Sequence, residues 1–208
     1  MTKEEVVKEY RVGEILDAAR KVVGRFGFEG ATIDRVADEA KVAKGTIYLY
    51  FRNKDDLLHS AVVEGLRSFI AELQGCDDSN RSPIERIGAL IREMFRLQNS
   101  NQDFLKALIL DSRFVTYAPG DKREQELREV YAAFIEHIAA VLRSAIEVGA
   151  IRSVDPQLAA FMLSEMMNGT LRRRLVGFAS TPPEADAEAV LDLFLYGVRG
   201  MVPQNGKR

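Results

Sequence analysis

The hydrophobic residues of this chain recur with helical spacing along nearly its whole length. The first apolar face of this kind comprises Ile15, Leu16, Ala19, Val22, Val23 and Phe26. Similar stripes lie within residues 33–40, 58–73, 84–95, 103–114, 121–149, 156–171 and 183–201. No segment shows a convincing alternation with period two, which is the pattern of a half-buried strand. The sequence therefore predicts an all-α protein of about nine helices.

Short polar signals mark several of the predicted helix ends. Ser82 and Glu85 have the spacing of a capping box, with Pro83 at the first helical position. We expect Gly27 to end the first helix, because a left-handed backbone costs glycine little. The charged residues 1–10 lack a convincing cap. They are predicted to form either a flexible arm that adds phosphate contacts or a tail without a role.

Residues 32–54 contain two short helical patterns separated by a tight connection. Thr32 is a suitable N-cap, because its hydroxyl can accept a hydrogen bond from an unpaired backbone N–H. The apolar stripe that follows comprises Ile33, Val36, Ala37 and Ala40. Only residues 41–43 separate it from the second pattern, in which Ile47 is the predicted buried anchor. This arrangement is typical of a helix-turn-helix whose second helix enters the DNA major groove.

The second helix of this pair carries side chains suited to DNA. Its predicted outward face has lysine, threonine and tyrosine side chains, and residues 41–54 contain no acid. Lysines and hydroxyls bind phosphate oxygens and fix the register on the duplex, while threonine can also touch a base edge. The alternative is a solvated helix face that happens to carry lysines. The predicted DNA-binding residues are Thr32, Lys44, Gly45, Thr46, Tyr48, Leu49, Tyr50 and Lys54.

Several short motifs follow one another between Ile15 and Leu58. They are Gly27 and Gly30 before Thr32, then Gly45-Thr46-Ile47-Tyr48, Tyr50-Phe51 and Arg52-Asn53-Lys54. In this order they resemble the TetR/AcrR (tetracycline-repressor) family of bacterial transcription regulators. The resemblance implies an N-terminal three-helix DNA-binding domain, residues 1–56, and a C-terminal helical effector-binding and dimerisation domain, residues 57–208. Two positions depart from the family pattern, because Ala43 replaces a Ser or Thr cap and Leu49-Tyr50 replaces an aromatic–His pair.

Composition narrows the class of protein. The 208 residues are 47% hydrophobic and 29% charged, which suits a folded protein with an ample core. The net charge is −2, yet residues 41–54 contain four basic residues and no acidic one, so the positive field is local. The single cysteine, Cys76, fits a reducing compartment. No apolar run reaches the ~18 residues of a membrane span, and the N-terminus is too charged for a secretory signal. We therefore expect a cytoplasmic protein without a membrane partner.

The last two predicted helices each carry an apolar face that must be covered. Gly197 and Gly200 cost ~1 kcal/mol each against alanine in a helix, which suggests close backbone approach. The faces are explained either by packing within one subunit or by a four-helix interface in a homodimer, and the resemblance favours the interface. Two recognition helices would then lie ~34 Å apart on a palindromic operator. The predicted interface residues are Phe161, Leu193, Phe194, Gly197, Val198 and Met201.

The resemblance also implies a small-molecule pocket in the second domain. An effector that prefers the conformation unsuited to DNA weakens DNA binding, and the two ligands then oppose each other. Methionine and aromatic side chains form adaptable apolar walls, although each is also an ordinary core residue. The effector is expected to be small and hydrophobic, with a fatty acid or acyl-CoA as the alternative within the family. The candidate lining residues are Met94, Phe95, Gln98, Phe104, Leu108, Phe114, Tyr117, Tyr131, Phe134, His137, Met162, Met166 and Asn168.

Three consecutive arginines, Arg172, Arg173 and Arg174, stand near the end of the eighth predicted helix. One role is favourable charge at a helix C-terminus. The other is a clamp for an acidic ligand, such as a carboxylate or the phosphates of an acyl-CoA. Because successive helical residues point ~100° apart, at most two of the three can face one pocket.

Motifs of enzyme chemistry are missing from the sequence. The two histidines, His59 and His137, are far apart, and there is no phosphate-binding glycine loop, H-E-x-x-H motif or cysteine pair. We therefore predict no catalytic residue, no metal and no cofactor. The remaining alternative is an architectural DNA-binding protein that senses no ligand. The sequence favours a ligand-responsive transcriptional repressor.

Overall fold

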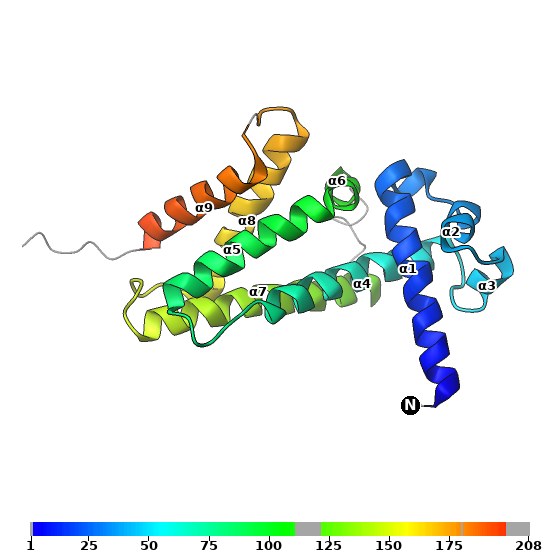
Figure 1. Cartoon of the computed structure of the whole chain (residues 1–208), viewed down its shortest axis with the longest axis horizontal. Coiled ribbons are helices and arrows are strands. Elements are labelled where there is room, and N and C mark those ends of the chain that lie inside the picture. The colour runs from blue at the N-terminus through cyan, green and yellow to red at the C-terminus, as the bar shows by residue number, and fades with distance from the viewer. Residues whose placement is uncertain (1, 111–121, 180, 199–208) are drawn as a thin grey trace, which may run out of the picture. The chain divides into compact units, whose positions relative to one another are not determined.

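The computed structural model describes residues 2–110, 122–179 and 181–198, and within those ranges it has nine α-helices and no strand (Figure 1). The prediction of an all-α fold is therefore confirmed. Contacts among the helices divide the chain into two compact units. Unit 1 comprises residues 1–70 and 100–131, and unit 2 comprises residues 71–99 and 132–208. A functional boundary between residues 56 and 57 remains a prediction.

The first helix, α1 (Lys3–Gly30), begins much earlier than its apolar stripe predicts. The Thr2 hydroxyl accepts a hydrogen bond from the Glu5 backbone N–H, and the Glu5 carboxylate accepts one from the Thr2 N–H. This capping box extends the helix through residues 3–10, so the prediction of a flexible arm is wrong. Gly27 has a φ of 68° and interrupts the helix one turn before its last residue. Glycine is favoured there because this backbone conformation strains other residues.

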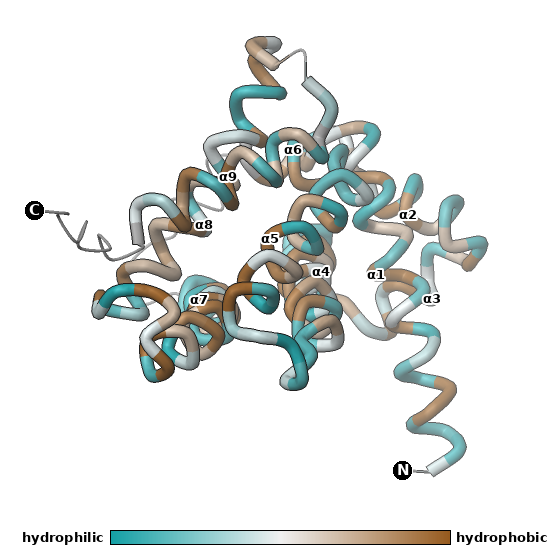
Figure 2. Tube along the Cα trace, turned by 60° about the vertical axis from the view of Figure 1, so that its left-hand side comes forward, coloured by the Kyte–Doolittle hydropathy of each residue, from teal (hydrophilic) through white to brown (hydrophobic). Residues whose placement is uncertain are grey.

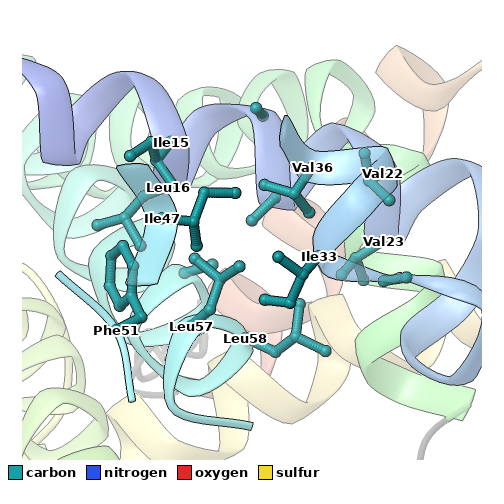
Figure 3. Packing of buried hydrophobic residues seen from close by; sticks show 14 of the residues in the cluster. Ile15, Leu16, Val22, Val23, Ile33, Val36, Ile47, Phe51, Leu57 and Leu58 are labelled. Atoms are coloured by element: carbon teal, nitrogen blue, oxygen red, sulfur yellow. The ribbon is translucent and has the colours of Figure 1, made fainter. Parts of the chain in front are cut away.

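The core of unit 1 joins α1 to three further helices, α2 (Ile33–Ala40), α3 (Lys44–Tyr48) and the start of α4 (Lys54–Gly75). Figure 3 shows the apolar side chains of these helices converging in one cluster. The short helix α6 (Gln102–Leu110) also packs on α1. A Cβ at Gly24 would lie 3.1 Å from the Cβ of Asp103, so a glycine permits this close packing. These contacts hold α2 and α3 in fixed positions on α1.

One residue of the first apolar stripe lies outside this cluster. Phe26 is 49% exposed, and the guanidinium of Arg35 lies 4.2 Å from the centre of its ring. The prediction that Phe26 belongs to the buried face is therefore wrong, because the interruption at Gly27 follows immediately. The contact is a cation–π interaction at the surface.

Unit 2 is built from the end of α4, α5 (Pro83–Ser100), most of α7 (Lys122–Glu147), α8 (Pro156–Leu175) and α9 (Pro183–Val198). The predicted capping box of α5 is present, since the Ser82 hydroxyl accepts from the Glu85 N–H and the Glu85 carboxylate accepts from the Ser82 N–H. The helices α8 and α9 lie side by side (Figure 1). The core residues of unit 2 that are fully buried include Leu73, Ile87, Ile91, Ile138, Leu142, Leu163 and Met167. No helix in the described part of the chain has the length and apolar content needed to cross a membrane.

Candidate nucleic-acid interface

The two helices of the predicted helix-turn-helix are anchored from the inside. The Thr32 hydroxyl accepts a hydrogen bond of 3.3 Å from the Arg35 N–H and caps α2 as predicted. Lys41 ends α2 in the left-handed conformation, with a φ of 55°. Ile47 of α3 is completely buried, and Figure 3 shows it among Ile15 and Leu16 of α1. The predicted anchor is thus confirmed, and α3 is short but firmly seated.

The remaining positions of α3 and its surroundings divide into exposed and half-buried residues. Lys44, Gly45, Tyr48 and Leu49 are exposed, as is Thr32. No described atom lies within 4 Å of a Cβ placed on Gly45, so packing within the protein does not require that glycine. Those five positions are open to a duplex.

Two of the residues that were expected to face outward do so only in part. Thr46 and Tyr50 are half-buried, and Tyr50 packs against the cluster of unit 1. The outward expectation for Tyr50 is wrong because α3 ends at Tyr48, so the helical spacing used to place residue 50 no longer applies. Ala43 provides no side-chain cap to α3, as its residue type predicts.

Both lysines predicted to contact phosphates already have partners within the protein. The Lys44 Nζ lies 2.7 Å from Oδ1 of Asp34 on α2, and the hydrogen bond to Asp34 raises the pKa of Lys44. The half-buried Lys54 donates a hydrogen bond of 2.9 Å to the carbonyl oxygen of Glu29. A phosphate therefore has to compete with Asp34 for Lys44. Lys54 ties the start of α4 to the end of α1.

Two further cations of this surface were missed. Lys41 and Arg52 are exposed, and neither side chain forms an ion pair with any residue that the structure describes. The Arg52 backbone N–H donates to Oδ2 of Asp56 at 2.9 Å, and this bond does not involve the guanidinium. The local count of four basic residues in positions 41–54 already contained this signal.

The residues predicted to line an effector pocket are spread over both units. Phe104 and Leu108 of unit 1 belong to the cluster on α1, where Phe104 is buried and Leu108 is partly buried. In unit 2, Met94, Phe95 and Gln98 are buried on α5, whereas Phe134, His137, Met166 and Asn168 are half-buried. Phe114 and Tyr117 lie outside the described residues.

Two predicted pocket residues are exposed in the protomer. Met162 is 59% exposed on α8, and Tyr131 is 38% exposed on α7. Their place in an effector pocket remains a prediction, and only the expectation of an apolar interior is not met at Met162.

His137 on α7 has a buried ring nitrogen that could bind a ligand. Its Nε2 is buried and has no hydrogen-bond partner among the described residues. Burial lowers the pKa of His137, although Asp77 and a hydrogen bond to the Leu73 backbone act in the opposite direction. A neutral ring that donates through Nδ1 to the Leu73 carbonyl leaves Nε2 as an acceptor. This nitrogen is therefore an available acceptor in unit 2, close to the ion pair of Asp77 with Arg86.

The arginines at the end of α8 have a structural partner. The Arg173 Nη2 donates to Oδ1 of the buried Asp186 on α9 at 2.8 Å, and the Arg174 Nη2 lies 2.7 Å from Oδ2. The second contact is an ion pair without good hydrogen-bond alignment. The Thr181 hydroxyl also donates to Asp186. All three arginines lie in the last turn of α8, as the predicted role at the helix C-terminus requires, and Arg173 and Arg174 in addition hold α8 to α9.

An open depression of about 620 Å³ lies elsewhere in unit 2, between the end of α4 and α5. It is lined by charged side chains, including Arg81, Arg92 and Arg96, and by Cys76. Burial raises the pKa of the Cys76 thiol, which is therefore poorly reactive. No residue predicted to bind the effector lines this depression.

Comparison with known proteins assigns both parts of the chain. Residues 15–61 match the sequence family described as bacterial regulatory proteins, tetR family, and residues 80–172 match a tetracyclin repressor-like C-terminal domain. This chain belongs to the tetR family. The resemblance of the motifs between residues 15 and 58 is thereby confirmed, and this tetR-family protein is a DNA-binding transcriptional regulator.

Relatives of this tetR-family regulator extend over nearly its whole length. The fatty acid metabolism regulator protein of Bacillus subtilis (strain 168) is 25% identical over 186 residues, which are 89% of this chain and 94% of the relative. The crystal structure of FadR from Bacillus subtilis in complex with stearoyl-CoA has a TM-score of 0.76 at 25% identity, over 89% of this chain and 98% of that one. FadR from Bacillus halodurans, at 24% identity, shows the same fold with a TM-score of 0.77 and covers 91% and 96% of the two chains.

The tetR-family regulator exposes apolar side chains on α8 and α9. Figure 2 shows apolar residues in brown and polar residues in teal along both helices. Phe161 and Leu193 are 47% and 65% exposed, consistent with the predicted interface, and Gly197 is exposed too. Phe194 is only 5% exposed, so its predicted place in an interface is wrong. It faces the core because it lies about 100° around α9 from Leu193. The Val198 side chain and Met201 lie outside the described part of the chain.

Proposed function

We propose that this protein is a repressor that binds a palindromic operator as a homodimer and is released by a long-chain acyl-CoA. The observation that carries the proposal is the seating of α3, whose exposed basic and aromatic residues project from a fixed core within a tetR-family domain. We place its action in the bacterial cytoplasm, where the chromosome lies.

In the proposed complex, α3 enters the major groove and the surrounding cations bind the backbone. Lys44 exchanges its ion pair with Asp34 for a phosphate, while Tyr48 and Leu49 reach toward the groove. The exposed Lys41 and Arg52 add phosphate contacts at either end of α3. Tyr50 and Lys54 position the helix-turn-helix from its inner side. Tyr50 packs on the core of unit 1, and Lys54 donates to the Glu29 carbonyl.

The choice of acyl-CoA as the effector rests on the relatives and on the interior of unit 2. The Bacillus subtilis relative is named for fatty acid metabolism, and the similar solved structure of FadR from the same species is bound to stearoyl-CoA; each is similar over about nine-tenths of this chain. The buried Met94 and Phe95 on α5 are flexible and aromatic residues of the kind that can repack around an alkyl chain. His137 Nε2 supplies the acceptor that an amide N–H of the pantetheine arm requires.

The experiment uses the full-length protein and genomic DNA fragments that it captures. Binding of a fluorescent captured fragment is followed by anisotropy, and thermal unfolding is followed separately, with stearoyl-CoA, stearate or free CoA added. Stearoyl-CoA is expected to release the DNA and to raise the unfolding temperature, since saturation at ~100 times Kd stabilises by ~2.7 kcal/mol. Free CoA is expected to do neither.

Lys44→Ala is the matched variant for this experiment. It is expected to bind DNA more weakly while keeping the thermal response to stearoyl-CoA, because the two sites are chemically separate. If stearoyl-CoA, stearate and CoA all leave both DNA binding and unfolding unchanged, the acyl-CoA proposal fails and the architectural alternative gains support. If the protein captures no duplex at low salt, the proposed repressor function fails.

A further inference from the structure

The exposed face of α8 has a polar centre between apolar ends. Residues seven apart on an α-helix point in nearly the same direction, because seven steps of 100° fall 20° short of two full turns. Glu165 and Arg172 are therefore on one line, with Gly169 between them, and all three are exposed. The apolar residues on the same line are Leu158, Phe161, Met162 and Val176, which are 47–59% exposed.

The charges on this face have no counter-charge among the residues that the structure describes. Glu165 accepts a hydrogen bond of 3.2 Å from the Asn168 amide and forms no ion pair in that part of the chain. Arg172 forms no ion pair with any residue in the described ranges, unlike Arg173 and Arg174, which bind Asp186. Glu165 and Arg172 are also separated by about 10 Å along the helix axis, so they do not neutralise each other directly.

Gly169 gives an independent indication of close approach by another molecule. A glycine inside a helix costs ~1 kcal/mol relative to alanine. Apart from the neighbouring backbone of α8 itself, no described atom lies within 4 Å of a Cβ placed on Gly169, so contacts with the rest of the described protomer do not account for the glycine. A second helix that crosses α8 at short distance beside Gly169 would account for the glycine.

We propose that α8 packs antiparallel against α8 of a second copy, with the twofold axis beside Gly169 and with reciprocal Glu165–Arg172 ion pairs across the interface. This proposal rests on the homodimer of the proposed function and specifies its register. A twofold interface brings one surface against itself, so every contact occurs twice. In this register Glu165 faces Arg172 of the partner subunit, and Phe161 faces Val176 of the partner subunit.

A second copy fits this face better than an unrelated partner because the face is complementary to itself. Turning the line of residues end to end about Gly169 exchanges the acidic and basic positions and places apolar residues opposite apolar residues. The exposed Leu193 and Tyr196 of α9 extend the apolar surface beside it. Complementary charges across such an interface select the register and the partner more than they add affinity.

The register is tested by charge reversal in the full-length protein, with self-association measured by sedimentation at low salt. Glu165→Arg places two positive charges opposite each other at both symmetric contacts, and Arg172→Glu does the same with negative charges. Each single variant is expected to dissociate about 100-fold more readily, from about tenfold at each of two contacts. An equimolar mixture of the two variants restores opposite charges at both contacts, so it is expected to form a heterodimer of nearly wild-type affinity.

Matched controls separate this register from general effects. Lys106→Glu reverses an exposed cation on α6 that forms no ion pair with a described residue, and Ala140→Leu adds bulk to an exposed position of α7. Neither change should alter association. Gly169→Leu should keep or raise the helix content but abolish the dimer. A wild-type protein that sediments as a monomer overturns the homodimer and this register with it. A wild-type dimer that tolerates both reversals, or reversals that the mixture fails to rescue, overturns the register alone.

Discussion

Asp186→Asn removes the charge that holds the end of α8 against the start of α9. Asp186 is buried, and both of its carboxylate oxygens face arginines, at 2.8 Å from Arg173 and 2.7 Å from Arg174. The asparagine has nearly the same volume, so the variant tests the charge rather than the packing. It leaves two guanidinium groups close together without a counter-charge.

The expected loss of stability follows from the burial of the three groups. Breaking a fully buried ion pair by removing one partner costs ~3–5 kcal/mol, because the other charge stays buried and unpaired. Here the Arg173 side chain is 46% exposed and can turn into water, whereas that of Arg174 is only 18% exposed. We therefore expect about 2 kcal/mol, which lowers the unfolding temperature of a protein of this size by about 4–8 °C.

The assay is urea unfolding and thermal unfolding at one fixed protein concentration, since dimer formation makes both depend on concentration. Arg52→Met is the control, because Arg52 is exposed, forms no ion pair with a described residue and lies outside the proposed dimer interface, so its unfolding should stay near the wild-type value. The double variant Asp186→Asn with Arg174→Met should recover part of the loss, because it removes the stranded charge. Wild-type unfolding of Asp186→Asn would refute the structural role of this cluster.

Three other predictions concern pH, helix capping and the DNA surface. His137→Phe should reduce the loss of stability in urea between pH 7 and pH 5. Burial lowers the pKa of His137 below its usual 6.5, so the contribution of the neutral ring to stability is complete above pH 6.5 and is lost as the pH falls through the folded pKa. An unchanged pH profile would contradict this. Ala43→Ser should stabilise the protein by ~0.5–1 kcal/mol in thermal unfolding, because α3 lacks a side-chain cap and residue 43 has an extended backbone; no gain would mean that the serine does not cap. Asp34→Asn should strengthen DNA binding about two- to fivefold at low salt, because it releases Lys44 from its ion pair. Equal or weaker binding in anisotropy titrations would show that Asp34 instead positions the lysine.

Features that depend on neighbouring residues in the chain were predictable from the sequence. The Thr32 cap, the buried Ile47 and the capping box at Ser82 follow from residue type and spacing within one or two helical turns. The same reasoning could have extended α1, because Thr2 and Glu5 have the spacing of a capping box. The high charge of residues 3–10 does not prevent a helix there, because the capping box binds the first backbone N–H groups.

Features that depend on helix rotation or on a meeting of distant segments were not predictable. A stripe of apolar residues does not say which of two adjacent side chains is buried, so Leu193 and Phe194 were both assigned to one interface although only Leu193 is exposed. The ion pair of Lys44 with Asp34 requires the angle between α2 and α3, which no local pattern gives. Its effect on DNA binding therefore became visible only in the structure.

The arginines at residues 172–174 depend both on local helical geometry and on a contact between distant segments. Helical geometry alone requires that they diverge, but only the turn between α8 and α9 decides that Asp186 receives Arg173 and Arg174 and leaves Arg172 on the outer face. Substituting Arg174 therefore disturbs the fold before it reports on any ligand, whereas substituting Arg172 disturbs association first. An effector assay on these arginines is interpretable only when stability and self-association are measured on the same samples. A loss of effector response that exceeds both effects would then point to direct contact with the ligand.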